Sequence, residues 1–147
     1  MTTKLNIALV ALAIATAAPA LAQEDNSSII GAWRMTSLQI ANPDGSMAEV
    51  PYSGQVIFSQ GGTLSVQAMN PDPDAEPTTY TANGYEAYYG PVVIDEEDDT
   101  FSITVESSLV RDLIGQELER VFDVSDDQLV ITPVNPEEGW RVTYERL

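Results

Sequence analysis

The sequence contains no cysteine and no histidine, and its only lysine is Lys4. Without cysteine, the chain can form neither a disulfide nor the lipid anchor of a lipoprotein, so its stability must come from packing. The usual protein ligands of zinc, copper and iron are missing, and so are the Ser-His-Asp and Cys-His groups of many hydrolases. We therefore expect no metal ion, no cofactor and no catalytic residue that the sequence can assign.

Basic residues of any kind are scarce, because six Lys and Arg stand against 23 Asp and Glu. The formal net charge is −17 at pH 7, and the arginines are scattered singly along the chain. Nucleic-acid binding requires clustered Lys or Arg that displace counterions from phosphates. The composition therefore argues against a nucleic-acid partner and favours an acidic, well-solvated surface.

Long hydrophobic runs are also absent, with one exception. Lys4 precedes an apolar segment at residues 7–19, which is followed by Ala20-Leu21-Ala22, and this is the pattern of a secretory signal peptide. The segment is short and rich in alanine compared with a membrane span, which needs about 20 apolar residues. We expect residues 1–22 to be removed after Ala22. Residues 23–147 would then form a single domain in the periplasm or outside the cell, with no membrane span.

The remaining sequence shows little helical periodicity and instead contains short runs in which apolar and polar residues alternate. Glycine, proline, asparagine and aspartate separate these runs at spacings typical of antiparallel meanders. The pattern predicts eight strands, at residues 32–40, 54–59, 63–69, 85–94, 100–107, 116–124, 128–133 and 140–146. Eight such strands can close into a single antiparallel up-and-down barrel, an all-β fold without exposed edges. Its interior is either filled by side chains or open to one small ligand.

Two segments do not follow the strand pattern. Residues 70–83 carry three prolines among acidic residues and threonines, so we expect a long loop of the kind that often covers a binding site. Residues 109–114 fit either a helical turn or a loop whose exposed apolar side chains cap a barrel mouth.

Several segments resemble those of a known family, beginning with Gly31-Ala32-Trp33, which is similar to the Gly-x-Trp opening of lipocalin-type barrels. The similarity continues, in order and spacing, at residues 54–59, 62–66, 88–90, 115–122 and 143–146. Together these segments resemble the bacterial lipocalin-like domain family over residues 29–147. The resemblance implies a calycin-type barrel and a hydrophobic ligand, and it brings no established catalytic motif.

The same resemblance places Gly31, Trp33 and Arg146 at the closed end of the barrel. The first and last strands meet when a meander closes, so we expect the Arg146 guanidinium to lie over the Trp33 indole. A cation–π contact of this kind contributes roughly 0.5–2 kcal/mol. We therefore assign these three residues to barrel closure and not to ligand binding.

Arg120 is the basic residue whose position bears most directly on function. It shares a strand face with Leu118 and Phe122, so its guanidinium is expected to point inward. A buried charge without a partner costs several kcal/mol. Four kinds of partner remain open: a carboxylate, with Glu106 or Glu86 as the internal candidates; a tyrosine hydroxyl; backbone carbonyls; or the acidic group of a ligand. The long side chain can also escape to water at the barrel rim.

Tyrosine hydroxyls can contribute further hydrogen bonds to a ligand that Arg120 binds. Tyr88 or Tyr144 can help Arg120 to bind the carboxylate of a lipid-like ligand. Tyr85 and Glu106 complete the candidate ligand-binding set. Tyr85 is one of several tyrosines in or beside the long loop that suit a pocket mouth, and Glu106 is a carboxylate near the tyrosines. Ordinary barrel packing suits these tyrosines equally well.

Three functions are compatible with these features. The first is binding of a small hydrophobic molecule, which can carry an acidic group, in the barrel interior. The second is an isomerase, cyclase or hydrolase that uses Glu86, Glu106 or tyrosines as acid and base. The third is a filled barrel that acts through its surface. An open pocket with an unpaired Arg120 would favour the first, whereas a filled interior with a paired Arg120 would favour the third. Nothing in the sequence predicts an oligomeric state.

Overall fold

The computed structural model describes residues 28–147, so the predicted signal peptide at residues 1–22 lies outside the described residues. Eight strands of five or more residues form the frame: β1 (Gly31–Ala41), β3 (Ser53–Phe58), β4 (Thr63–Met69), β6 (Tyr85–Asp95), β7 (Thr100–Thr104), β9 (Glu117–Ser125), β10 (Gln128–Pro133) and β11 (Trp140–Arg146). These strands agree closely with the eight that the sequence predicts. No helix among residues 28–147 has the length and apolarity needed to cross a membrane.

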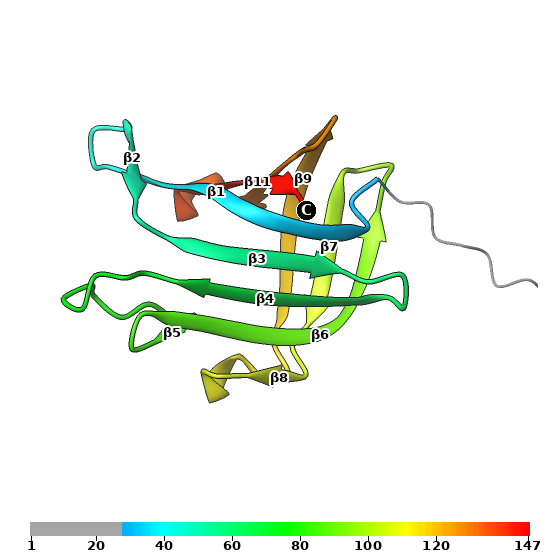
Figure 1. Ribbon diagram of the computed structural model, residues 1–147, viewed down its shortest axis with the longest axis horizontal. Helices are drawn as coiled ribbons and strands as arrows, with labels where there is room; N and C mark the ends of the chain where they lie inside the picture. Colours follow the sequence, from blue (N-terminus) through cyan, green and yellow to red (C-terminus); the bar gives the residue numbers. More distant parts are fainter. Residues whose placement is uncertain (1–27) are drawn as a thin grey trace, which may run out of the picture.

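The eight strands close into one antiparallel barrel. Their order is β11-β10-β9-β7-β6-β4-β3-β1, and β1 pairs in turn with β11, which leaves no open edge in this series. Strands β1, β3, β4 and β6 form a front layer that crosses β7 and β9 behind it (Figure 1). The predicted all-β, eight-stranded up-and-down barrel is therefore confirmed.

Three short strands and two 3₁₀ turns were not predicted as such. Strand β2 (Met47–Val50) pairs with the C-terminal part of β1, at residues 38–41, and β5 (Thr81–Ala82) lies within the predicted long loop. The predicted strand at 100–107 is interrupted, because β7 ends at Thr104. Strand β8 (Ser107–Ser108) continues along the same neighbour, β6, with the pairing shifted by one residue. The open alternative at residues 109–114 resolves into a helical turn, η1 (Arg111–Leu113), and the second turn is η2 (Pro136–Glu138).

Gly90 accounts for the interruption after β7. A Cβ at this position would lie only 1.9 Å from the Thr104 carbonyl oxygen, so only glycine lets β6 pass so close to this backbone. Just beyond the crossing, the Glu106 N–H donates to the Tyr89 carbonyl. Residues 106–109 therefore continue along β6, whereas the pairing with β9 ends at Thr104.

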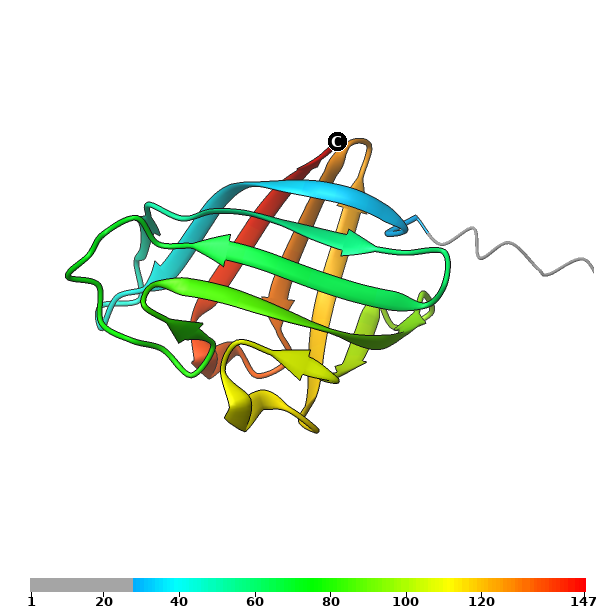
Figure 2. The ribbon, with the colours of Figure 1, turned by 60° about the horizontal axis from the view of Figure 1, so that its bottom comes forward.

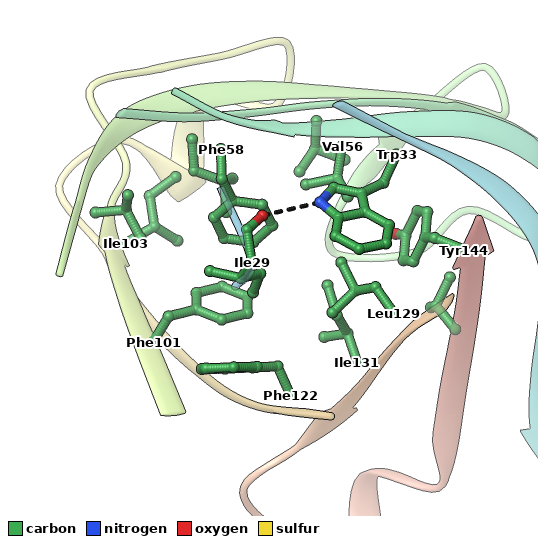
Figure 3. Packing of buried hydrophobic residues seen from close by; sticks show 14 residues of the cluster. Ile29, Trp33, Val56, Phe58, Phe101, Ile103, Phe122, Leu129, Ile131 and Tyr144 are labelled. Carbon is green, nitrogen blue, oxygen red and sulfur yellow. Dashed lines mark hydrogen bonds between the residues drawn. The ribbon is translucent and has the colours of Figure 1, made fainter. Parts of the chain in front are cut away.

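The core fills the end of the barrel where β1 begins and β11 ends. Trp33 is fully buried, and its indole N–H donates to the Ile29 carbonyl at 2.9 Å, as Figure 3 shows. Phe101 packs edge-on against Phe58, with 5.1 Å between ring centroids, and its ring lies 6.4 Å from that of Phe122. These aromatic side chains close the interior at this end.

Arg146 covers the outer side of this core. Its guanidinium carbon lies 3.9 Å from the centroid of the Trp33 ring, and its Nη1 and Nη2 donate to the carbonyls of Ile30 and Ser28. Gly31 leaves the room for this arrangement, because its φ of 141° is one that side-chain-bearing residues rarely adopt and a Cβ would lie 2.8 Å from Arg146 Nη1. The three residues together form what we call the Trp33–Arg146 seal.

Candidate functional site

A cavity of about 280 Å³ occupies the other end of the barrel. It is lined by the end of β1 and the start of β11, whereas the Trp33–Arg146 seal lies at the start of β1 and the end of β11. Figure 2 shows that the β4–β5 connection and the β1–β2 turn lie at this same end of the barrel. The barrel is therefore filled at one end and hollow at the other.

The walls of the cavity are mostly apolar. Alternation along the strands places at least one inward side chain from each of the eight barrel strands into it, and the apolar ones include Val56, Leu64, Val66, Phe101, Ile131 and Val142. Ligand pockets for drug-sized molecules have volumes of roughly 300–1,000 Å³. A cavity of about 280 Å³ matches the small end of that range and suits a short, flexible hydrophobic molecule.

Arg120 supplies the positive charge of this cavity. It belongs to β9, where it pairs with Phe101 of β7 and Pro133 of β10, and its side chain is half-buried. Nη2 donates to the Tyr80 hydroxyl at 2.9 Å, and Nη1 donates to the Glu119 carbonyl at 2.7 Å. A guanidinium has five N–H donors, so these two bonds leave donors available.

Two aromatic rings hold the Arg120 guanidinium in place. Its central carbon lies 5.1 Å from the Trp140 ring and 5.9 Å from the Tyr80 ring. Neither ring neutralises the charge, and within residues 28–147 the ion pairs join other residues, namely Arg34 with Glu145 and Arg146 with Asp127. Arg120 is therefore a positioned cation without a carboxylate partner.

Glu86 is the acidic group of the cavity. It lies on β6, and burial raises the pKa of its carboxyl to about 7, although the nearby positive charge of Arg120 acts in the opposite direction. A raised pKa means that the protonated form persists near neutral pH. Glu86 and Arg120 therefore line one cavity without forming an ion pair.

Three tyrosines surround Glu86. Tyr52, Tyr88 and Tyr144 all line the cavity, and burial raises the pKa of each phenol, with a further contribution from the negative charge of Glu86. All three therefore stay neutral at physiological pH and act as hydrogen-bonding groups.

The structure brings together only part of the candidate set. Arg120, Tyr88 and Tyr144 line the cavity with Glu86. Tyr85 does not, because alternation along β6 turns it outward, where it borders a shallow surface groove with Met69. Glu106 is exposed and lies beyond the end of β7, so it neither lines the cavity nor pairs with Arg120. The prediction that Glu106 pairs with Arg120 is therefore wrong. Glu86 lines the same cavity as Arg120 but forms no ion pair with it.

Two contacts of Arg120 were not predicted. Trp140 alternates with Val142 and Tyr144 along β11, and this pattern was sufficient to place it inward. No sequence pattern indicated the hydrogen bond that the Tyr80 hydroxyl accepts from Arg120, because Tyr80 belongs to a loop without strand alternation. Hydrogen bonds between Thr78 and the Thr81 hydroxyl fix that loop locally, and Thr81 is buried.

The remaining predicted features lie away from the cavity. Residues 109–114 do not line it, so they do not cap its mouth. Among residues 28–147, no group of three His, Cys, Asp or Glu side chains is arranged to hold a metal ion.

Comparisons with known proteins bear on the fold. A lipocalin-like protein from Bacteroides uniformis has a solved structure that is similar over 80% of this chain and 97% of its own, with 17% identity and a TM-score of 0.51. An uncharacterized protein from Bacteroides eggerthii matches over 80% of this chain and 98% of its own, with 19% identity and a TM-score of 0.48. A mutant of the fluorescent protein UnaG matches over 80% of this chain and 95% of its own, with 12% identity and a TM-score of 0.39.

No curated protein matches the sequence. The sequence profile of the lipocalin-like domain, however, matches residues 30–145, which is most of the chain and contains all eight barrel strands except the last residue of β11. The chain therefore belongs to the lipocalin-like domain family.

Proposed function

We propose that this protein is exported and binds a small hydrophobic molecule with an acidic group in the hollow end of its barrel. The observation that carries the proposal is Arg120, a positioned cation without an ion-pair partner at a mostly apolar cavity. The pattern of residues 1–22 supports export. In this arrangement the hydrocarbon part lies against the apolar walls and the acidic group meets the guanidinium.

A ligand with both an apolar and an acidic part gains affinity from one and orientation from the other. Burial of apolar surface contributes roughly 25 cal/mol for each Å² removed from water, without regard to orientation. A charge-assisted hydrogen bond between guanidinium and carboxylate adds about 1.5–3 kcal/mol and fixes which end of the ligand lies at Arg120. Tyr80 and Trp140 already hold the guanidinium, so binding does not have to order that side chain.

Decanoate is a suitable probe, because it combines a short hydrocarbon chain with one carboxylate. We expect it to bind at pH 6, and we expect Arg120→Met to weaken binding by about 10- to 100-fold, as loss of one charge-assisted interaction implies. Decan-1-ol, which lacks the carboxylate, should bind the wild type and R120M equally. Isothermal titration calorimetry measures all four affinities.

The matched control is Arg141→Met, which removes the same charge from an exposed position on β11. R141M should bind decanoate as the wild type does. If decanoate does not bind, or if it binds R120M and the wild type with equal affinity, the proposed acidic-ligand site is wrong. Native mass spectrometry of protein purified from its own cells would identify a ligand that copurifies.

A further inference from the structure

Glu86 and its neighbouring tyrosines have hydrogen-bonding capacity that the protein does not use. Within residues 28–147, no hydrogen bond or ion pair joins the side chains of Glu86, Tyr52, Tyr88 or Tyr144 to another protein group. All four line the cavity. Unlike Arg120, whose guanidinium is held by Tyr80 and the Glu119 carbonyl, these groups have no partner of their own.

These oxygens are not sealed inside packed protein. No buried side-chain nitrogen or oxygen among the described residues lacks a hydrogen-bond partner, so each unbonded oxygen of the four keeps surface that a molecule in the cavity can reach. A ligand that covers such a group without bonding it removes its water and loses affinity. A plain hydrocarbon chain would do this as it passes Glu86.

The chemistry of Glu86 indicates what a better ligand carries. A protonated carboxyl has one O–H donor and retains acceptor capacity on its oxygens. An amide is complementary to it, since the amide N–H donates to a carboxyl oxygen while the amide carbonyl accepts from an O–H. The phenols of Tyr88 and Tyr144 offer further O–H donors on the same cavity.

We propose that the cavity prefers amphiphiles in which an amide lies between the acidic group and the hydrocarbon chain, with N-acyl amino acids as the simplest class. Glu86 is then the residue that determines specificity, and Arg120 binds the terminal carboxylate. This inference rests on the proposed function, because it assumes that an acidic amphiphile enters the cavity with its head group at Arg120.

The test compares N-decanoylglycine with N-decanoylsarcosine, which differs by one N-methyl group and lacks the amide N–H. We expect the wild type to bind N-decanoylglycine about ten-fold more tightly at pH 6, as measured by calorimetry. Glu86→Met removes the partner of the N–H while it keeps an unbranched side chain in the wall. In E86M the two ligands should bind with nearly equal affinity.

Two controls separate the possible causes of a preference. Glu106→Met removes a carboxyl from an exposed position outside the cavity and should leave the ten-fold preference intact. Retained binding of N-decanoylsarcosine to E86M shows that this variant is folded. If the added methyl group were disfavoured only because of its bulk, the preference would persist in E86M, and the inference would be overturned.

Failure of this inference is distinguishable from failure of the proposed function. If N-decanoylglycine and N-decanoylsarcosine bind the wild type equally, and both lose affinity in R120M, the amide preference is wrong and the acidic-ligand site stands. If neither these ligands nor decanoate binds, the proposed function is wrong, and the inference is overturned with it.

Discussion

Replacement of Trp33 by alanine is expected to lower the free energy of unfolding by about 3–5 kcal/mol, the usual cost of removing a fully buried large aromatic side chain. Trp33 has no exposed surface and donates to the Ile29 carbonyl, and Arg146 lies on its ring. The substitution therefore creates a cavity and also removes the surface on which Arg146 rests. Urea denaturation followed by circular dichroism measures the change.

The second tryptophan provides the matched control. Trp140 is half-buried at the cavity, so Trp140→Ala should cost much less than Trp33→Ala. If Trp33→Ala leaves no folded protein, Trp33→Phe and Arg146→Met, alone and combined, give the coupling between the two residues by a double-mutant cycle. We expect that coupling to be roughly 0.5–2 kcal/mol. Equal losses in W33A and W140A would contradict the account of the Trp33–Arg146 seal.

Glu86 is expected to make the protein less stable as the pH rises from about 5 to 7. Its pKa is about 7 in the folded protein, against an ordinary value of 4.5. In that interval the folded protein keeps a proton that the unfolded chain releases, so rising pH favours unfolding. A rise in pKa from 4.5 to about 7 corresponds to a loss of at most about 3 kcal/mol, complete above pH 7.

Glu86→Gln isolates this effect, because glutamine does not titrate. Arg120 is the charged group that acts on Glu86. The cavity tyrosines, whose pKa values are raised by burial and by Glu86, stay neutral over this interval. Urea denaturation from pH 5 to 8 should show E86Q gaining on the wild type as the pH rises. Glu106→Gln, at an exposed position, should follow the wild type. Parallel wild-type and E86Q profiles would exclude a raised pKa for Glu86.

The barrel frame was predictable because alternation and turn residues carry it. Residues 63–69 alternate Leu64, Val66 and Ala68 with polar neighbours, and this alternation gave the exact bounds of β4. The short strands had weaker signals. Strand β2 has no fully buried side chain, and β5 is two residues long, so neither shows an apolar pattern.

The site was predictable where it follows a strand face. Alternation placed Arg120 inward, and Trp140 obeys the same rule on β11. The partner of Arg120 was not predictable, because Tyr80 reaches it from 40 positions away through a loop without periodicity. Glu106 was misplaced although alternation with the buried Ile103 and Val105 already turns it outward, so the rule that placed Arg120 correctly would have excluded Glu106.

In the proposed complex, an acidic amphiphile lies in the hollow end of the barrel with its head group at Arg120. Isotope-filtered NOE spectra of the wild type with ¹³C-labelled decanoate at pH 6 test it most directly. We expect contacts from the methylene next to the carboxylate to the Trp140 and Tyr80 rings, and from the terminal methyl group to Val56 and Leu64. The reverse orientation, or contacts confined to the outer surface, would contradict the account.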